Sequence, residues 1–123
     1  MVTRPVLFDT NILIDYLRGI PQARAQCDNH SDRAVSIVTW MEVMAGSTDA
    51  NDADTRSFLL NFSTLPLDAD VAERACLLRR NNRVKLPDAI IQATAEDSGR
   101  ILITRNTRDF PPGTPGVLIP YTL

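Results

Sequence analysis

The sequence has few of the residues that usually bind transition metals or form disulfides. Among 123 residues there are one histidine and two cysteines. Cys27 and Cys76 lie far apart, in no Cys-x-x-Cys or other metal-type spacing, so we expect two reduced thiols on helices. His30 lies in a polar turn, and we expect it at the surface with no catalytic role. Thiolate metal chemistry and a disulfide framework are therefore not predicted.

Long apolar runs and nucleotide-binding signatures are also missing. No apolar run approaches a membrane span, and Asp9 interrupts the N-terminal run too early for a signal peptide. There is no Walker A loop, Gly-x-Ser-x-Gly elbow or Gly-x-Gly-x-x-Gly fingerprint. With 44% apolar residues, the composition is that of an ordinary globular protein. We expect one domain, residues 1–123, in a cytoplasmic protein with no membrane partner.

Lysine is scarce, whereas arginine is concentrated in the second half of the chain. Only Lys85 among thirteen basic residues is a lysine, and the net charge is −2. Residues 74–108 nevertheless carry eight basic and three acidic side chains. Arginine binds phosphate oxygens through two parallel hydrogen bonds, so a phosphate-rich partner is compatible with this segment. Solvated helix faces or a codon bias explain the excess equally well, and the role of the segment stays open.

Short apolar runs alternate with helical patterns along the whole chain. The predicted strands are residues 6–8, 34–38, 63–67, 100–104 and 116–119. Strands that alternate with helices are typical of an α/β fold with right-handed crossovers. We therefore predict an α/β domain with a mostly parallel sheet of four to five strands flanked by helices.

The first strand is followed at once by a carboxylate. The run Val6–Phe8 has the character of a buried strand, and the apolar spacing of residues 12–17 predicts a helix directly after it. Asp9 lies at the junction, on the edge of a parallel sheet where ligands usually bind. Taken alone, this stretch is better explained by Asp9, Thr10 or Asn11 capping that helix.

Three further acids lie at comparable places. Glu42 is one helical turn after the second strand, Asp109 follows the fourth, and Asp88 lies in the first turn of a helix. Each has a structural explanation, such as a capping box formed by Thr39 and Glu42, or an Asx turn at Asp109. Because helices begin at the carboxyl edge of such a sheet, all four acids tend toward one edge. Carboxylates crowded in this way take up a proton or recruit a cation.

The chemistry of this set points to a hard metal ion. An oxygen-only cluster without histidine or cysteine suits Mg²⁺ or Mn²⁺ better than Zn²⁺. Such ions support the hydrolysis of phosphodiesters. Other acid-based α/β chemistries fit less well, because a dehalogenase-like phosphotransferase needs Asp-x-Asp where this chain has Asp9-Thr10-Asn11. A receiver-type phosphoacceptor needs an adjacent pair of acids at the end of the first strand and a lysine after a late strand. This chain has a single acid there, and its one lysine is Lys85.

Five short segments in a fixed order carry a family resemblance. The segments are Phe8–Ile12, Asp15–Gly19, Glu42-Val43-x-x-Gly46, Lys85–Ile91 and Thr104-x-Asn106-x-x-Asp109-Phe110. With them the chain resembles, over essentially its whole length, the PIN-domain family and its VapC-type ribonuclease toxins. Leu-Pro-Asp-Ala together with Asn-x-x-Asp-Phe is the most specific part of the match.

The resemblance implies an endoribonuclease that depends on Mg²⁺ or Mn²⁺ and uses an acidic constellation of Asp9, Glu42, Asp88 and Asp109. It implies metal contact, direct or through water, for Asp9, Asp88 and Asp109. Glu42 would be a further ligand or would orient the attacking water. The polar residues expected to support these acids are Asn11, Thr104 and Asn106. The implied partners are an RNA substrate, a small antitoxin protein and a second copy of the chain in a homodimer.

Two alternatives remain open at this point. The same fold could act on DNA, or process RNA, without an antitoxin. A neighbouring gene for a small protein with a DNA-binding head and a disordered tail would favour the toxin. The chain could instead be a non-catalytic binding module whose acids only cap helices. Stabilisation by Mn²⁺ that disappears in Asp88→Ala would separate an enzyme from such a module.

Overall fold

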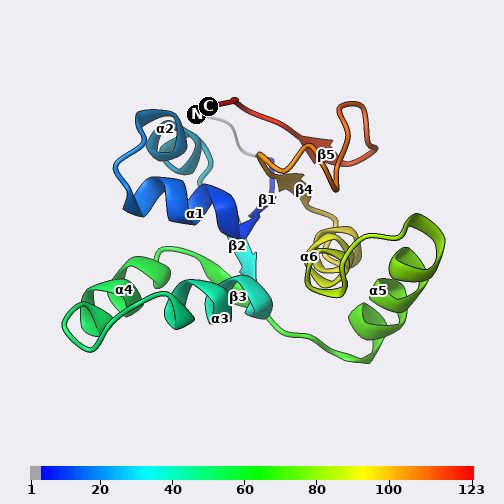
Figure 1. Cartoon of the computed structure of the whole chain (residues 1–123), viewed down its shortest axis with the longest axis horizontal. Helices are drawn as coiled ribbons and strands as arrows, with labels where there is room; N and C mark the ends of the chain where they lie inside the picture. The colour runs from blue at the N-terminus through cyan, green and yellow to red at the C-terminus, as the bar shows by residue number, and fades with distance from the viewer. Residues whose placement is uncertain (1–3) are drawn as a thin grey trace.

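The computed structural model describes residues 4–123 and has five strands and six helices in these residues (Figure 1). The strands are β1 Val6–Phe8, β2 Arg33–Ser36, β3 Ser63–Leu65, β4 Ile101–Ile103 and β5 Val117–Leu118. The helices are α1 Thr10–Leu17, α2 Pro21–Asn29, α3 Ile37–Ala45, α4 Asp52–Leu59, α5 Ala69–Asn82 and α6 Leu86–Asp97. None of these helices is long and apolar enough to cross a membrane.

The strands form one sheet in the order β3-β2-β1-β4-β5, and every neighbouring pair is parallel. The predicted α/β class with a parallel sheet of four to five strands is thus confirmed. In register, Val6 of β1 is paired with Arg33 on one side and with Ile101 on the other. The two central pairings therefore bring β1 beside strands from the middle and the end of the sequence. Parallel strands of this kind are covered by helices on both faces, which explains their apolar runs.

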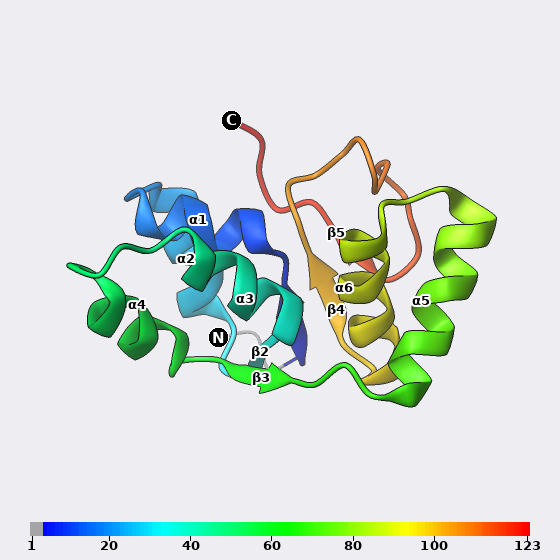
Figure 2. The ribbon, with the colours of Figure 1, turned by 60° about the horizontal axis from the view of Figure 1, so that its bottom comes forward.

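Alternation along each strand divides the core into two parts. Val6 and Phe8 pack with helices α1 to α4 on one face, whereas Leu7 points to the opposite face and packs with α6. Figures 1 and 2 show these helices on the two sides of the sheet, with α6 between the sheet and α5. A third cluster, which includes Val71 of α5 and Ala93 of α6, joins these two helices. Helix α5 therefore packs mainly against α6, which separates it from the sheet.

The second strand and the helix after it begin earlier than predicted. Strand β2 ends at Ser36, and the Ser36 hydroxyl caps helix α3 by accepting a hydrogen bond from the Val38 amide at 3.0 Å. Thr39 is therefore a buried residue inside α3, and the predicted capping box with Glu42 is wrong. The Glu42 carboxylate is left available for other contacts.

His30 is buried rather than exposed, so its predicted surface position is wrong. It follows α2, and its ring packs edge-on against Phe8 with 6.1 Å between the ring centroids. Burial, with a smaller contribution from the charge of Arg4, lowers the pKa of His30. The polar residues next to His30 in the sequence suggested exposure, but they gave no information about the contact with Phe8, which is distant in the sequence.

Candidate active site at the carboxyl edge of the sheet

Asp9 is the most deeply buried of the predicted site acids. It directly follows β1, and its backbone amide donates to the Ile103 carbonyl at 2.9 Å, which ties it to the end of β4. Its carboxylate accepts hydrogen bonds from the Thr10 amide and the Thr104 hydroxyl, both at 2.7 Å. Asp9 thus caps helix α1 and also reaches across to the neighbouring strand. Capping accounts for only one of its two carboxylate oxygens.

Glu42 is held beside this strand end by a threonine pair. The Thr10 hydroxyl donates to the Glu42 carboxylate at 2.7 Å, and it lies 3.0 Å from the buried Thr39 hydroxyl. The residues Thr39 and Glu42 belong to α3, whereas Thr10 opens α1. Glu42 therefore leans toward the end of β1, near enough for its charge to raise the pKa of Asp9.

Asp88 and Asp109 meet on the other side of the site. Asp88 lies in the first turn of α6, and Asp109 lies in the loop after β4. Their carboxyl groups lie close enough for each to affect the pKa of the other. Asn106 orients Asp109, because its amide nitrogen donates to the Asp109 carboxylate at 2.9 Å and its amide oxygen accepts from the Asp109 backbone at 3.2 Å.

The electrostatics of the four acids reflect this crowding. Burial and then the close contact with the Asp109 carboxyl raise the pKa of Asp88 to about 7, with further contributions from the charges of Asp9, Asp109 and Glu42. Burial also raises the pKa of Asp9, against the hydrogen bonds that it accepts. The hydrogen bond from Asn106 lowers the pKa of Asp109. The structure therefore brings Asp9, Glu42 and Asp109 within electrostatic range of Asp88.

The three polar residues expected around the acids lie among them. Asn11 donates to Asp9 and to the Thr104 hydroxyl, each at 3.2 Å, and accepts from the Arg105 backbone at 3.1 Å. The Thr104 hydroxyl in turn accepts a hydrogen bond from the backbone amide of Asn106 at 3.0 Å. One chain of hydrogen bonds thus connects the end of β1, the end of β4 and the loop that carries Asp109.

A buried ion pair that the sequence analysis missed supports the same loop. The Arg105 guanidinium donates to both oxygens of Asp15 at 2.7 and 2.9 Å, and the Tyr121 hydroxyl donates to Asp15 at 2.8 Å. Asp15 is 2% exposed. Its position six residues after Asp9 on α1, and that of Arg105 beside Thr104, were the available signals. The pair locks α1, the loop after β4 and the C-terminal segment together.

This ion pair predicts how stability depends on pH. Burial alone would raise the pKa of Asp15, but the hydrogen bonds from Arg105 and Tyr121 and the Arg105 charge outweigh it and lower the pKa. A carboxyl whose pKa is lowered on folding stabilises the fold above its unfolded pKa, near 3.9, and loses this contribution as the pH falls through the folded pKa. Asp15→Asn should therefore be less stable than wild type at neutral pH, and the difference should shrink as the pH falls below the unfolded pKa of Asp15.

Urea unfolding at a series of pH values measures this difference directly. Asp97→Asn is a suitable control, because Asp97 is exposed and forms no side-chain hydrogen bond within residues 4–123. A difference between wild type and Asp15→Asn that stays constant from neutral to acid pH would contradict the assignment.

The donor set fits a hard divalent cation. All four acids and their neighbours offer oxygen ligands, and their mutual repulsion raises the pKa of Asp88 where a cation would relieve it. Within residues 4–123, no three His, Cys, Asp or Glu side chains converge tightly enough to hold an ion by themselves. Mg²⁺ keeps several waters and commonly uses only one or two protein carboxylates, so such an open arrangement suits it.

The fold and site define a class of protein, a parallel α/β domain with an acid cluster at the carboxyl edge of its sheet. Comparison with known proteins identifies the family within this class. The family model described as PIN domain matches residues 6–111. Ribonuclease VapC10 of Mycobacterium tuberculosis is 32% identical over 114 residues, with 86% of each chain covered. The tRNA(fMet)-specific endonuclease VapC of Shigella flexneri is 31% identical over 116 residues, covering 85% of this chain and 88% of that protein.

A solved structure is also closely similar. The toxin–antitoxin complex from Klebsiella pneumoniae contains a chain that superposes with a TM-score of 0.91 at 45% identity, covering 96% of this chain and 99% of the other. The chain therefore belongs to the PIN domain family, among its VapC ribonucleases. Nucleases of this group depend in general on a metal ion.

Proposed function

We propose that this chain is an endoribonuclease that hydrolyses RNA phosphodiester bonds with Mg²⁺ or Mn²⁺, and that it is the toxin of a toxin–antitoxin pair in the cytoplasm. The observation that carries the proposal is the gathering of Asp9, Glu42, Asp88 and Asp109 at one sheet edge in a chain related to VapC ribonucleases. Crowded carboxylates cost free energy unless a cation or proton compensates them, so their presence favours a metal-binding function over capping.

In this proposal Asp9, Asp88 and Asp109 hold the metal, directly or through water. The bound ion would supply Lewis acidity toward the phosphate and a bound water of lowered pKa. Asp9 is fixed for this role by Thr104, and Asp109 is fixed by Asn106. These hydrogen bonds set the direction of each carboxylate before substrate binds, which is how surrounding residues tune a metal site.

Glu42 has a different position from the other three acids. It is exposed, and only the Thr10 hydroxyl anchors it in residues 4–123. A carboxylate held from one side and open to solvent on the other can accept a proton from an attacking water. We assign Glu42 the orientation of that water, or a further metal contact.

We also propose two protein partners, a small antitoxin and a second copy of the chain. The antitoxin is supported by the similarity to a toxin–antitoxin complex from Klebsiella pneumoniae. A homodimer is supported by the family resemblance.

Cleavage of RNA by the purified chain tests the enzymatic part of the proposal. We expect cleavage of a labelled RNA in Mg²⁺ or Mn²⁺, loss of cleavage in EDTA, and recovery when the ion is restored in excess. Cleavage that continues unchanged in EDTA would contradict metal-dependent hydrolysis. The same assay with single-stranded and duplex DNA separates the ribonuclease from a DNA-directed nuclease of the same fold.

A further inference from the structure

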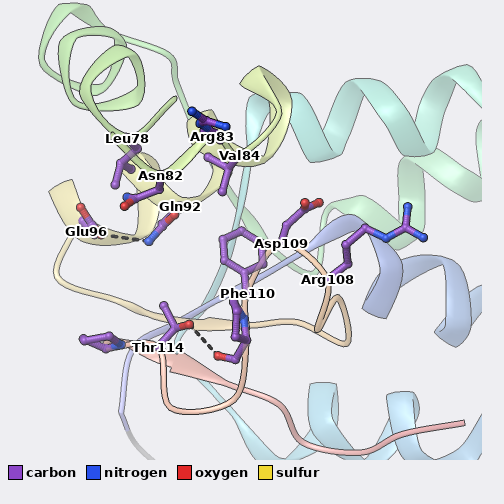
Figure 3. A pocket seen from close by; sticks show the side chains of 12 residues that line it. Leu78, Asn82, Arg83, Val84, Gln92, Glu96, Arg108, Asp109, Phe110 and Thr114 are labelled. Carbon is purple, nitrogen blue, oxygen red and sulfur yellow. Dashed lines mark hydrogen bonds between the residues drawn. The ribbon is translucent and has the colours of Figure 1, made fainter. Parts of the chain in front are cut away.

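A cavity of about 550 Å³ opens beside Asp109 and plays no part in the function described so far. It lies between the C-terminal end of α5, the outer side of α6 and the loop of residues 108–115 (Figure 3). Its volume is in the range of small-ligand sites, about 300–1,000 Å³. Because Asp109 is part of both the acid cluster and the cavity wall, whatever enters the cavity lies next to the cleavage site.

The polar end of the cavity is formed by Gln92 and Glu96. They are one turn apart on α6, and the Gln92 amide nitrogen donates to one Glu96 oxygen at 3.4 Å (Figure 3). Gln92 is 8% exposed, which is rare for a glutamine without a full set of partners. Its amide oxygen accepts no hydrogen bond from residues 4–123, and the second Glu96 oxygen has only a long contact, 3.5 Å, to Arg74. Both side chains line the cavity, so the Gln92 amide oxygen and the half-exposed Glu96 carboxylate are acceptors that a bound donor could use.

The remaining walls suit a flat aromatic ligand with phosphates on either side. Leu78, Val84 and Pro111 contribute apolar surface that can lie against ring faces. Arg83 and Arg108 are exposed at the rim, where a guanidinium can pair with a phosphate oxygen. Arg83 is the only described non-glycine residue with a positive φ, 58°, because it terminates α5 in the left-handed conformation. The helix ending therefore places a cation at this rim.

We propose that the cavity binds a guanine next to the cleaved bond of the RNA, with Glu96 and Gln92 accepting hydrogen bonds from its Watson–Crick edge. Guanine offers two adjacent donors on that edge, whereas adenine and cytosine offer one donor beside an acceptor, and uracil offers one donor between two acceptors. Unpaired bases in single-stranded RNA are read on this edge. The inference rests on the proposed ribonuclease function and names the sequence preference of that site.

Because Glu96 and Asp109 line the cavity, a cationic side chain of a protein partner could bind there instead of a base. The two arginines at the rim disfavour it, because they would repel an approaching cation while attracting an RNA backbone. Among the residues that line the cavity, the acids Glu96 and Asp109 are balanced by Arg83 and Arg108. The balance matches a neutral base linked to charged phosphates better than it matches a cation.

The test compares cleavage of a pool of random RNA oligonucleotides by wild type, Glu96→Gln and Asp97→Asn, with sequencing of the cleaved ends. Asp97 adjoins Glu96 on α6 but does not line the cavity, so it is a matched control. We expect wild type to favour guanine at one position beside the cut. Glu96→Gln should lower that preference by about 5- to 150-fold, the range for losing one well-formed base contact. Cleavage at sites without guanine should remain.

The outcomes separate this inference from the proposed function. Guanine enrichment that Glu96→Gln reduces and Asp97→Asn preserves supports the cavity as a base site. Wild-type cleavage without guanine enrichment, or enrichment that Glu96→Gln leaves intact, overturns the inference but not the ribonuclease. Failure of wild type to cleave any RNA overturns both. Unchanged preference with weakened antitoxin binding assigns the cavity to the protein partner and also overturns it. Gln92→Ala gives a second, independent variant if folding of the first is impaired.

Discussion

Asp9→Asn should reduce RNA cleavage by about 100- to 1,000-fold or more, the size of effect seen when one pre-oriented electrostatic group is lost from an active site. Asp9 is the acid that Thr10 and Thr104 hold from two sides, so its carboxylate has the least freedom of the four. Asparagine keeps the shape but removes the negative charge and one acceptor. The measurement is a single-turnover cleavage rate at saturating Mg²⁺ or Mn²⁺.

Two further variants make this result specific. Thr104→Val removes the hydroxyl that donates to Asp9 at 2.7 Å and should lower the rate by a smaller factor, about 10- to 100-fold. Asp97→Asn should cleave like wild type. Thermal unfolding of each variant shows whether it is folded. A folded Asp9→Asn protein with wild-type cleavage would place the active site elsewhere, or reveal a contaminating nuclease.

Arg105→Ala should lower the free energy of unfolding by about 2–4 kcal/mol, because it leaves the Asp15 carboxylate buried without its charged partner. Asp15 is 2% exposed, and after the change Tyr121 would be the one side chain within residues 4–123 that still donates to it. The Arg105 side chain is 32% exposed, so the loss should fall below that of a fully enclosed ion pair. Urea unfolding at neutral pH measures the change.

Arg108→Ala is the matched control for this prediction. Arg108 lies on the same loop, is exposed, and makes no side-chain hydrogen bond or ion pair within residues 4–123, so its removal should change stability by less than about 0.5 kcal/mol. Arg105→Lys keeps the charge but not the two parallel hydrogen bonds and should fall between wild type and Arg105→Ala. Equal stability of the two alanine variants would show that the ion pair contributes nothing measurable.

Much of the architecture could be read from the sequence, because its strands are short apolar runs set between amphipathic or capped helices. Asp68, for example, is a residue type that caps helices well, and its carboxylate accepts from the Val71 amide at 2.9 Å at the start of α5, which ends at Asn82. Pro66 has no amide hydrogen to donate within a sheet, which suits the end of a strand or the edge of a sheet, and β3 just before it lies at one end of the sheet. These features depend on residues close together in the sequence, so a local sequence pattern can predict them.

Contacts between distant segments were not available from such patterns. The sequence placed four acids at one edge from topology alone, and the roles of these acids and of Asn11, Thr104 and Asn106 remain predictions. It gave no sign that Thr10 would anchor Glu42, since 32 residues separate them. The predicted boundary between β2 and α3 was wrong, because Ser36 and Thr39 are both good helix caps and the sequence pattern did not distinguish them. In the structure the cap is Ser36.

The pairing of β1 with β4 has a consequence for synthesis of the protein on the ribosome. Asp9 is oriented by Thr104, which comes 95 residues later in the chain. Contacts between such distant residues form late, because a large loop must close before they are gained. A growing chain that lacks residues 104–109 has neither Thr104 nor Asp109 and cannot assemble the acid cluster. Nuclease activity should therefore first appear after residues 104–109 have left the ribosome and β4 has paired with β1.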